Sequence, residues 1–170
     1  VSRGLGDVYK RQVVVGGGMA GVCAAIASAR KGVRTAIVQN RSMFGGNASS
    51  EIRMHIVGAN AHGSKKNLGE TGILLEILLE NKRRNPYASF PVFDSVIWEK
   101  VHFQENLDAY LNTDMDDVIM DGKKVAAIVG HQNTTETEFT IYGDIFVDAT
   151  GHGTLATMGG AAGRMGSASH

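Results

Sequence analysis

The chain has 170 residues, of which 43% are hydrophobic and 20% charged, as in ordinary globular proteins. Lysine plus arginine and aspartate plus glutamate balance at 17 each, so no basic excess indicates nucleic acid or an anionic membrane as partner. No apolar run reaches the roughly 18 residues that a membrane span needs. Cys23 is the only cysteine, which excludes an internal disulfide and a cysteine-based metal or iron–sulfur site within this chain.

The first twelve residues differ in character from the rest. Residues 2–12 (SRGLGDVYKRQ) match a translated reading frame of a sequencing-library adapter, so we expect 1–12 to be a non-native segment outside the fold. Residues 13–170 are then one domain, incomplete at its C-terminus, with a helical insertion at about 64–91. Under this interpretation the native N-terminus and any targeting signal are missing, with the cytoplasm favoured. The missing C-terminal part of the chain is an expected partner, and this piece is expected to be inactive alone.

The strongest motif is a strand, a glycine turn and a helix in immediate succession. Val13–Val15 predict a short buried strand, and the alanine-rich run after Gly21 predicts a helix. The turn between them has the spacing Gly-x-Gly-x-x-Gly, the fingerprint of dinucleotide binding. Its three glycines serve the tight turn, the close approach of the pyrophosphate, and the packing of the helix on the sheet. The helix N-terminus attracts phosphate through free N–H groups and partial positive charge. The predicted cofactor-binding residues here are Gly16, Gly18, Met19, Ala20 and Gly21.

A second buried strand over residues 34–38 completes a βαβ unit. Gln39 follows it, eighteen residues after Gly21, where such units usually carry an acid that binds the adenosine ribose. An amide can also bond ribose hydroxyls, although less strongly than a carboxylate. Asn40 and Arg41 are predicted contacts of the same kind. Arg41 leaves open a 2′-phosphate, and hence NADP, as a minority alternative.

A second glycine turn at residues 44–51 is rich in small hydroxyl residues. Its position directly after the βαβ unit favours contact with the same cofactor, and a plain surface loop is the alternative. The predicted cofactor-binding residues of this turn are Gly45, Gly46, Asn47, Ser49 and Ser50.

The remaining predicted elements are two helices followed by strands. Residues 70–84 predict a helix with Ile73, Leu74, Ile77 and Leu78 on one face, and Asp94 is predicted to cap a second helix that runs to about residue 104. A short strand follows at 107–111. Residues 115–142 then predict a three-stranded antiparallel meander, and 145–147 a separate buried strand before the Ala149-Thr150-Gly151 turn. The predicted fold class is α/β, with a parallel sheet plus the meander.

Together these features resemble the FAD domain of glutathione-reductase-type flavoproteins. Within them, the closest resemblance is to the FAD-dependent oxidoreductase branch that includes heterodisulfide-reductase-like proteins. The residues that carry it are Val13–Gly21, Gly45–Arg53, Glu70–Ile73 and Asp148–Gly153. The resemblance implies an FAD/NAD(P)-binding Rossmann-like fold, FAD as cofactor, and hydride or electron transfer between a small-molecule substrate and an acceptor. It also places Ala149, Thr150 and Gly151 against the cofactor.

The sequence departs from that branch at three points. Gln39 replaces the ribose-binding acid, His152 stands where an aspartate is expected, and the cysteine clusters of the heterodisulfide-reductase-like proteins are absent. Iron–sulfur chemistry is therefore not carried over, and the scattered histidines predict no metal site.

The resemblance also locates candidate catalytic groups in residues 47–63, which would pass beside the flavin. Arg53 could stabilise negative charge on reduced flavin or substrate, and His55 or His62 could move a proton near neutral pH. A structural salt bridge for Arg53 and surface positions for both histidines are the alternatives.

Two other functions stay open. Residues 16–30 also resemble the opening of a tRNA-modifying flavoprotein, although the chain lacks a basic stripe for RNA. A non-catalytic NAD-binding module is the other, and the meander argues against it because plain NAD domains repeat βαβ units.

Overall fold

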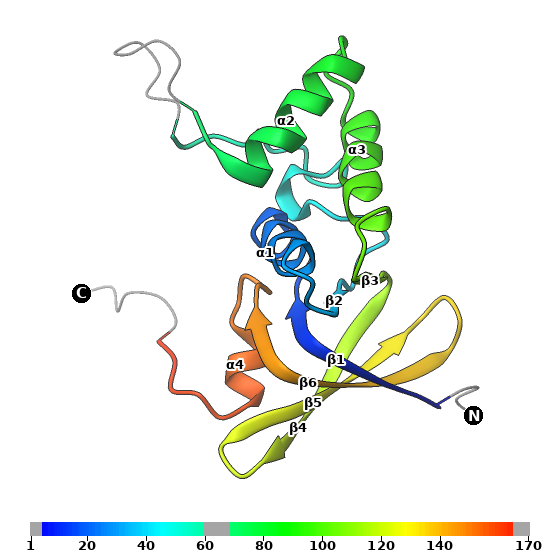
Figure 1. Ribbon diagram of the computed structural model, residues 1–170, viewed down its shortest axis with the longest axis vertical. Helices are drawn as coiled ribbons and strands as arrows, with labels where there is room; N and C mark the ends of the chain where they lie inside the picture. The colour runs from blue at the N-terminus through cyan, green and yellow to red at the C-terminus, as the bar shows by residue number, and fades with distance from the viewer. Residues whose placement is uncertain (1–4, 60–68, 165–170) are drawn as a thin grey trace.

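The computed structural model describes residues 5–59 and 69–164, which form helices and one β-sheet (Figure 1). The strands are β1 Leu5–Val15, β2 Thr35–Val38, β3 Leu107–Tyr110, β4 Thr113–Asp121, β5 Lys124–Gln132 and β6 Thr137–Asp148. The helices are α1 Met19–Arg30, α2 Gly72–Arg84, α3 Phe90–His102 and α4 Thr154–Met158, with a 3-10 turn at Gly46–Ala48. None of the helices in these two ranges is both long enough and apolar enough to span a membrane.

All six strands form one sheet in the order β3-β2-β1-β6-β5-β4. The pairs β3–β2, β2–β1 and β1–β6 are parallel, whereas β6–β5 and β5–β4 are antiparallel. The predicted fold class, a parallel sheet joined to a three-stranded meander, is therefore confirmed.

Strand β6 corrects one boundary of the prediction. The last meander strand and the strand predicted at 145–147 are a single strand, Thr137–Asp148. The reason is its neighbour, since β1 pairs with β6 from Leu5–Glu138 through Val15–Asp148 and holds both halves in one register. Gly143 continues the strand, where a Cβ would lie 2.9 Å from Cγ2 of Val13.

Strand β1 begins at Leu5, eight residues before the predicted start at Val13. Residues 5–10 pair with 138–143 of β6, and the Tyr9 hydroxyl donates a 2.7 Å hydrogen bond to Asp144. Lys10 forms an ion pair with Asp108. The expectation that the first twelve residues lie outside the fold is thus wrong for 5–12, because β6 offers a backbone edge that the segment can pair with.

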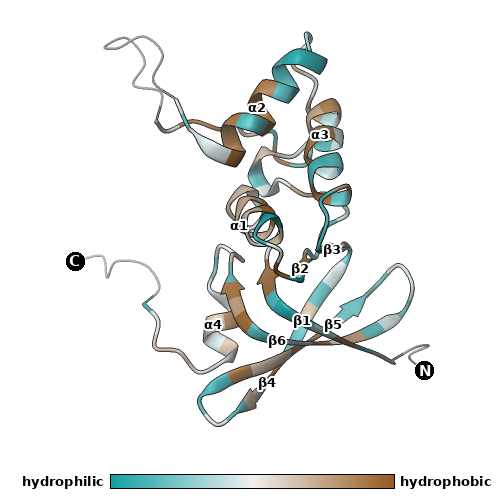
Figure 2. Ribbon diagram, in the orientation of Figure 1, coloured by the Kyte–Doolittle hydropathy of each residue, from teal (hydrophilic) through white to brown (hydrophobic). Residues whose placement is uncertain are grey.

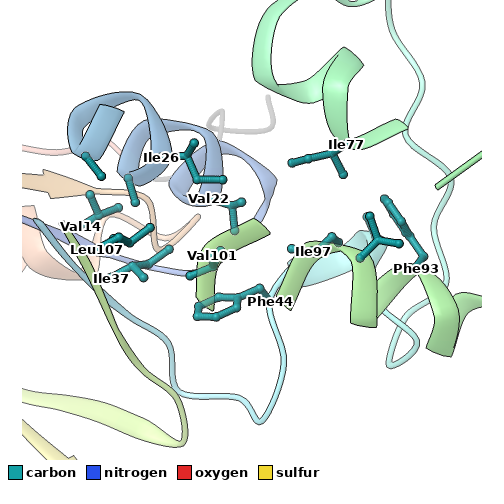
Figure 3. Close-up of a cluster of buried hydrophobic side chains, with 14 residues drawn as sticks. Val14, Val22, Ile26, Ile37, Phe44, Ile77, Phe93, Ile97, Val101 and Leu107 are labelled. Atoms are coloured by element: carbon teal, nitrogen blue, oxygen red, sulfur yellow. The ribbon is translucent and has the colours of Figure 1, made fainter. Parts of the chain in front are cut away.

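Hydrophobic side chains from β1 and its neighbours pack on both faces of the sheet. Successive strand residues point to opposite faces, so Val14 faces α1 while Val13 and Val15 face the meander. The cluster under α1 also takes in buried residues of α2 and α3 (Figure 3). Its labelled members are Val14, Val22, Ile26, Ile37, Phe44, Ile77, Phe93, Ile97, Val101 and Leu107. Figure 2 shows the apolar colour at the carboxyl ends of β1 and β6, beside α1, and mixed colours along α2 and α3.

Helix α2, within the predicted insertion, shares this core. Ile77 is fully buried. At the surface of the helix, Glu76 forms ion pairs with both neighbouring helices, α1 and α3. Glu76 accepts two hydrogen bonds from Arg30 of α1, at 2.8 and 2.9 Å, and one from Lys100 of α3 at 2.6 Å. These bonds, first those from Arg30, lower the pKa of Glu76 to about 2.

Helix α3 begins earlier than predicted. Ser89 is its N-cap residue and Pro91 occupies its first turn, a position that proline's fixed φ favours. Asp94 therefore lies inside the helix and does not cap it. Its carboxylate instead accepts the backbone N–H of Ser50 at 3.0 Å, which ties α3 to the second glycine turn.

Candidate cofactor-binding site

Two of the three fingerprint glycines are needed for the fold itself. Gly16 has φ +104°, donates its N–H to the carbonyl of Val38 at 2.8 Å, and touches the turn after β6. A Cβ at Gly16 would lie 2.3 Å from the carbonyl oxygen of Ala149. A Cβ at Gly21 would lie 1.9 Å from the carbonyl oxygen of Gly16, so only glycine lets α1 pack this closely on the turn.

Gly18 has the opposite surroundings. It is the N-cap residue of α1, its backbone is extended, and no atom lies within 4 Å of a Cβ built on it. The first turn of α1 contains no acidic residue that would offset the positive end of the helix. The first N–H groups of a helix have no partner within the helix. This open, positively polarised cradle fits a pyrophosphate.

The second glycine turn lies beside the first. The N–H of Gly45 donates to the carbonyl of Gly17 at 2.8 Å, and a Cβ on Gly46 would lie 3.1 Å from Cα of Gly18. Gly45 and Gly46 have φ of +109° and +57°, a region that favours glycine. The structure thus brings together two turns that are separated in the sequence by helix α1 and strand β2.

The polar groups of this second turn hold the turn together. The hydroxyl of buried Ser49 accepts the N–H of Glu51 at 3.3 Å, and that of Ser50 donates to the sulfur of Met43 at 3.3 Å. The carbonyl of Asn47 accepts the N–H of Met54 at 2.8 Å, while its side chain is exposed.

A cavity of about 260 Å³ opens at the carboxyl ends of β1 and β2. In open α/β sheets ligands bind beyond this edge of the strands. Its lining residues come from the ends of β1 and β2, the start of β4 and the turn after β6. They are Val15, Gly16, Val38, Gln39, Asn40, Thr113, Asp114, Met115, Thr150, His152 and Thr154.

Gln39 lines this cavity but is 7% exposed, with hydrogen bonds at both ends of its amide. Oε1 accepts the N–H of Gly17 at 2.9 Å, and Nε2 donates to the carbonyl of Met43 at 3.3 Å. Asn40 is exposed at the rim. Arg41 is not among the lining residues, and its Nε donates to Glu51 at 2.9 Å.

The turn after β6 is organised by Asp148. Its Oδ1 accepts the N–H and hydroxyl of Thr150 at 3.0 and 2.7 Å, and Oδ2 accepts the N–H of Ala156 at 2.9 Å. Partial burial opposes ionisation, but these hydrogen bonds outweigh it and lower the pKa of Asp148. Thr150 also accepts the N–H of Thr154 at 2.9 Å, so its side chain shapes the turn that carries Ala149 and Gly151.

Two of the candidate catalytic residues, Arg53 and His55, are not among the residues that line the 260 Å³ cavity. Arg53 has φ +61°, is exposed, and donates its Nε to the carbonyl of Ser50 at 3.1 Å. His55 is exposed, with its ring centroid 5.6 Å from that of Phe90, and lines a smaller hollow of about 170 Å³ against α2 and α3. His62 lies outside the described residues.

Sequence reasoning missed several residues of this region. Asp114, Thr113 and Met115 line the cavity, yet they belong to no motif. Their place depends on β4, whose Thr113 donates its N–H to the carbonyl of Gln39 at 3.0 Å. A polar residue at the start of the meander is the one sequence signal that points to Asp114. Across residues 5–59 and 69–164, no three His, Cys, Asp or Glu side chains gather in a way that could hold a metal.

Comparison with known proteins identifies the group to which this site belongs. The model of the FAD dependent oxidoreductase family matches residues 12–170. No curated protein matches the sequence. THI4 of Thermovibrio ammonificans is a similar solved structure, 25% identical with a TM-score of 0.62, with 91% of this chain and 64% of that one covered.

Two further structures show the same fold at lower identity. The flavin-dependent brominase Bmp2 is 17% identical with a TM-score of 0.61, over 92% of this chain and 42% of that one. Glycerol-3-phosphate dehydrogenase from Bacillus halodurans, complexed with FAD, is 18% identical with a TM-score of 0.57, over 89% and 36%. The chain spans 36% to 64% of the length of these three relatives. Because the family model matches residues 12–170, nearly the whole of this chain, the chain belongs to the FAD-dependent oxidoreductase family, and its cofactor is FAD.

Proposed function

We propose that this chain is the FAD-holding part of an oxidoreductase that moves hydride or electrons between a small-molecule substrate and an acceptor. The observation that carries the proposal is the free space at Gly18, bordered by Gly46 and the N-terminus of α1. When bound, FAD supplies the redox chemistry, while the protein supplies binding, orientation and electrostatics.

In this proposal, the two glycine turns and the cavity each bind a different part of FAD. The pyrophosphate lies against the first turn and the start of α1, and the adenosine enters the 260 Å³ cavity. The second turn, with its backbone and small side chains, faces the flavin half. The proposed pyrophosphate contacts are Gly16, Gly18, Met19, Ala20 and Gly21, and the flavin-side contacts are Gly45, Gly46, Asn47, Ser49 and Ser50. Gln39 and Asn40 border the adenosine, Arg41 follows them in the chain outside the cavity, and Ala149, Thr150 and Gly151 close the site.

The alternative of a 2′-phosphorylated cofactor loses support from Arg41. Its Nε pairs with Glu51, and Asp114 places a negative charge in the cavity that would repel a phosphate. We therefore propose an adenosine without the 2′-phosphate.

The proposed function is tested by titrating the purified chain with FAD and following the quenching of flavin fluorescence. Saturable binding is expected, with ADP competing and FMN failing to compete, because the described site fits the ADP half of the dinucleotide. NAD, which shares that half but has no flavin for the second turn, is expected to bind more weakly. Absence of saturation by FAD, or tighter binding of NAD than of FAD, would contradict the proposal.

The loop after the second glycine turn is proposed to tune the flavin. The exposed guanidinium of Arg53 keeps its position through the carbonyl of Ser50, and a fixed positive charge near the flavin stabilises its anionic reduced form. Arg53→Ala is then expected to lower the two-electron midpoint potential of bound FAD by about 30 mV, a tenfold change in the redox equilibrium. Spectroelectrochemistry of the FAD complex measures it.

Arg41→Ala is the matched control, because it removes the same charge from an arginine that pairs with Glu51 in the preceding segment. An unchanged potential in Arg53→Ala, or an equal fall in both variants, would remove Arg53 from the proposed chemistry. Either His55 or His62 is proposed to move the proton, and alanine in place of the residue that does so should slow flavin reduction by substrate at least about tenfold.

A further inference from the structure

The cavity at the end of β2 lacks the acid that usually binds an adenosine ribose, and Gln39 stands in that place. Its amide oxygen accepts the N–H of Gly17, and its amide nitrogen donates to the carbonyl of Met43. Both glycine turns are therefore braced by one buried side chain. Gln39 is a positioning residue for the phosphate cradle, and the ribose hydroxyls need another acceptor.

Asp114 is the one acidic residue among the described residues that line the cavity. It follows Thr113, whose N–H bonds the carbonyl of Gln39, so the two strand ends place Asp114 at the same rim as Gln39. One carboxylate oxygen, Oδ2, accepts the side-chain N–H of exposed Asn133 at 2.8 Å, which orients the group. A carboxylate has about four acceptor positions, so acceptor capacity is left for a diol.

Three other polar side chains of the cavity suit this role less well. The hydroxyl of Thr113 is buried and donates to the carbonyl of Leu111 at 2.9 Å, and Thr150 is engaged by Asp148 and Thr154. Asn40 is exposed at the rim. A hydrogen bond to an ionised acceptor is roughly twice as strong as a neutral one, which favours Asp114.

We propose that Asp114 binds the ribose hydroxyls of the adenosine moiety and replaces, from β4, the acid that β2 does not provide. The inference rests on the proposed function, since it requires the ADP half of FAD to enter this cavity. It makes Asp114 a specificity residue that favours a free 2′-hydroxyl.

Calorimetric titration with ADP and 2′-deoxy-ADP tests the proposal on the whole chain. The unsubstituted protein is expected to prefer ADP about tenfold, the size of one charge-assisted hydrogen bond. In Asp114→Asn the preference should fall below about threefold, because ADP loses the hydrogen bonds of both ribose hydroxyls, whereas 2′-deoxy-ADP has only the 3′-hydroxyl to lose and weakens less. Gln39→Ala should weaken the binding of ADP and of 2′-deoxy-ADP equally and keep the preference for ADP, because Gln39 acts through the glycine turns.

Two control variants separate this role from general effects of charge and folding. Asp116→Asn removes the same charge from an exposed residue of β4 outside the cavity, and Asn133→Ala removes the partner of Asp114 but keeps its carboxylate. Both should retain the preference for ADP. If Asp114→Asn does not fold, the unsubstituted protein still tests the proposal, because the absence of a preference for ADP over 2′-deoxy-ADP overturns it.

The outcomes distinguish the failure of this inference from the failure of the proposed function. If the unsubstituted protein binds neither ADP nor FAD, the proposed function fails. If it binds ADP but Asp114→Asn keeps the tenfold preference, or loses instead a preference for ADP over IDP, the ribose assignment is overturned. Loss of a preference for ADP over IDP would mean that the carboxylate of Asp114 accepts a hydrogen bond from the adenine amino group.

Discussion

Valine at position 18 is expected to abolish FAD binding while the protein remains folded. The Cβ of residue 18 would enter space that no protein atom occupies within 4 Å, at the N-terminus of α1 where the pyrophosphate is proposed to lie. The extended backbone of Gly18, with φ −66° and ψ 175°, is open to valine without strain. The branched side chain therefore competes with the ligand and not with the fold.

Binding and stability should respond differently to this substitution. FAD affinity should fall at least about a hundredfold, because the phosphate loses its approach to several backbone N–H groups at once. A poorer N-cap costs about 1 kcal/mol, so the melting temperature should fall by no more than about 4 °C. Fluorescence titration and thermal circular dichroism measure the two quantities.

Gly69→Val is the matched control, since Gly69 also has no atom within 4 Å of its Cβ but lies far from α1 in the sequence. It should bind FAD normally. Unchanged FAD affinity in Gly18→Val would mean that the first turn only shapes the fold.

In contrast to Gly18→Val, which should affect binding and not folding, Gly21→Ala is expected to destabilise the fold. A Cβ there would lie 1.9 Å from the carbonyl oxygen of Gly16 and 3.2 Å from Cβ of Ala149. Backbone at such a distance must move, so α1 is pushed away from the turn and from the cluster that contains Val22 and Ile26. Overpacking of this kind costs about 3 kcal/mol, which corresponds to a fall of about 6–12 °C in melting temperature.

Gly18→Ala provides the control, because it is the same substitution three residues earlier at a position with open space. Thermal circular dichroism of both variants is the measurement, and only Gly21→Ala should show the large fall. A Gly21→Ala protein that melts within about 2 °C of the unsubstituted chain would show that helix and turn pack less closely than described.

Local patterns were sufficient for the parts of this fold that depend on near neighbours in the chain. Three valines followed by the glycine turn and an alanine-rich run predicted β1, the turn and α1, and the strand 35–38 followed at βαβ spacing. The apolar face around Ile77 predicted α2, because helical period is a property of a short segment. The glycine fingerprint likewise predicts where a cofactor is held, because its chemistry lies in the backbone, and the binding experiments above test that prediction.

Long-range pairing accounts for what the patterns did not predict. Residues 5–12 match an adapter sequence and were expected to lie outside the fold, yet they are part of β1 because they pair with β6. The same pairing joins the two halves of β6. The side chain of Asp94 was expected to cap a helix and instead holds Ser50, a partner 44 residues away.

In the candidate site, too, some features follow from local sequence and others from long-range contacts. A sequence motif marks the position of Gln39, but whether that amide faces a ribose or braces Gly17 depends on how two distant turns are brought together. Asp114 enters the cavity because the start of β4 lies beside the end of β2, although the two strands are not neighbours in the sheet, and only the folded structure shows this contact. The amino-acid sequence thus specified the glycine turn of the proposed phosphate cradle through local backbone requirements, whereas the tertiary structure selected the side chains that line the cavity proposed for the adenosine, because those contacts join residues far apart in the chain.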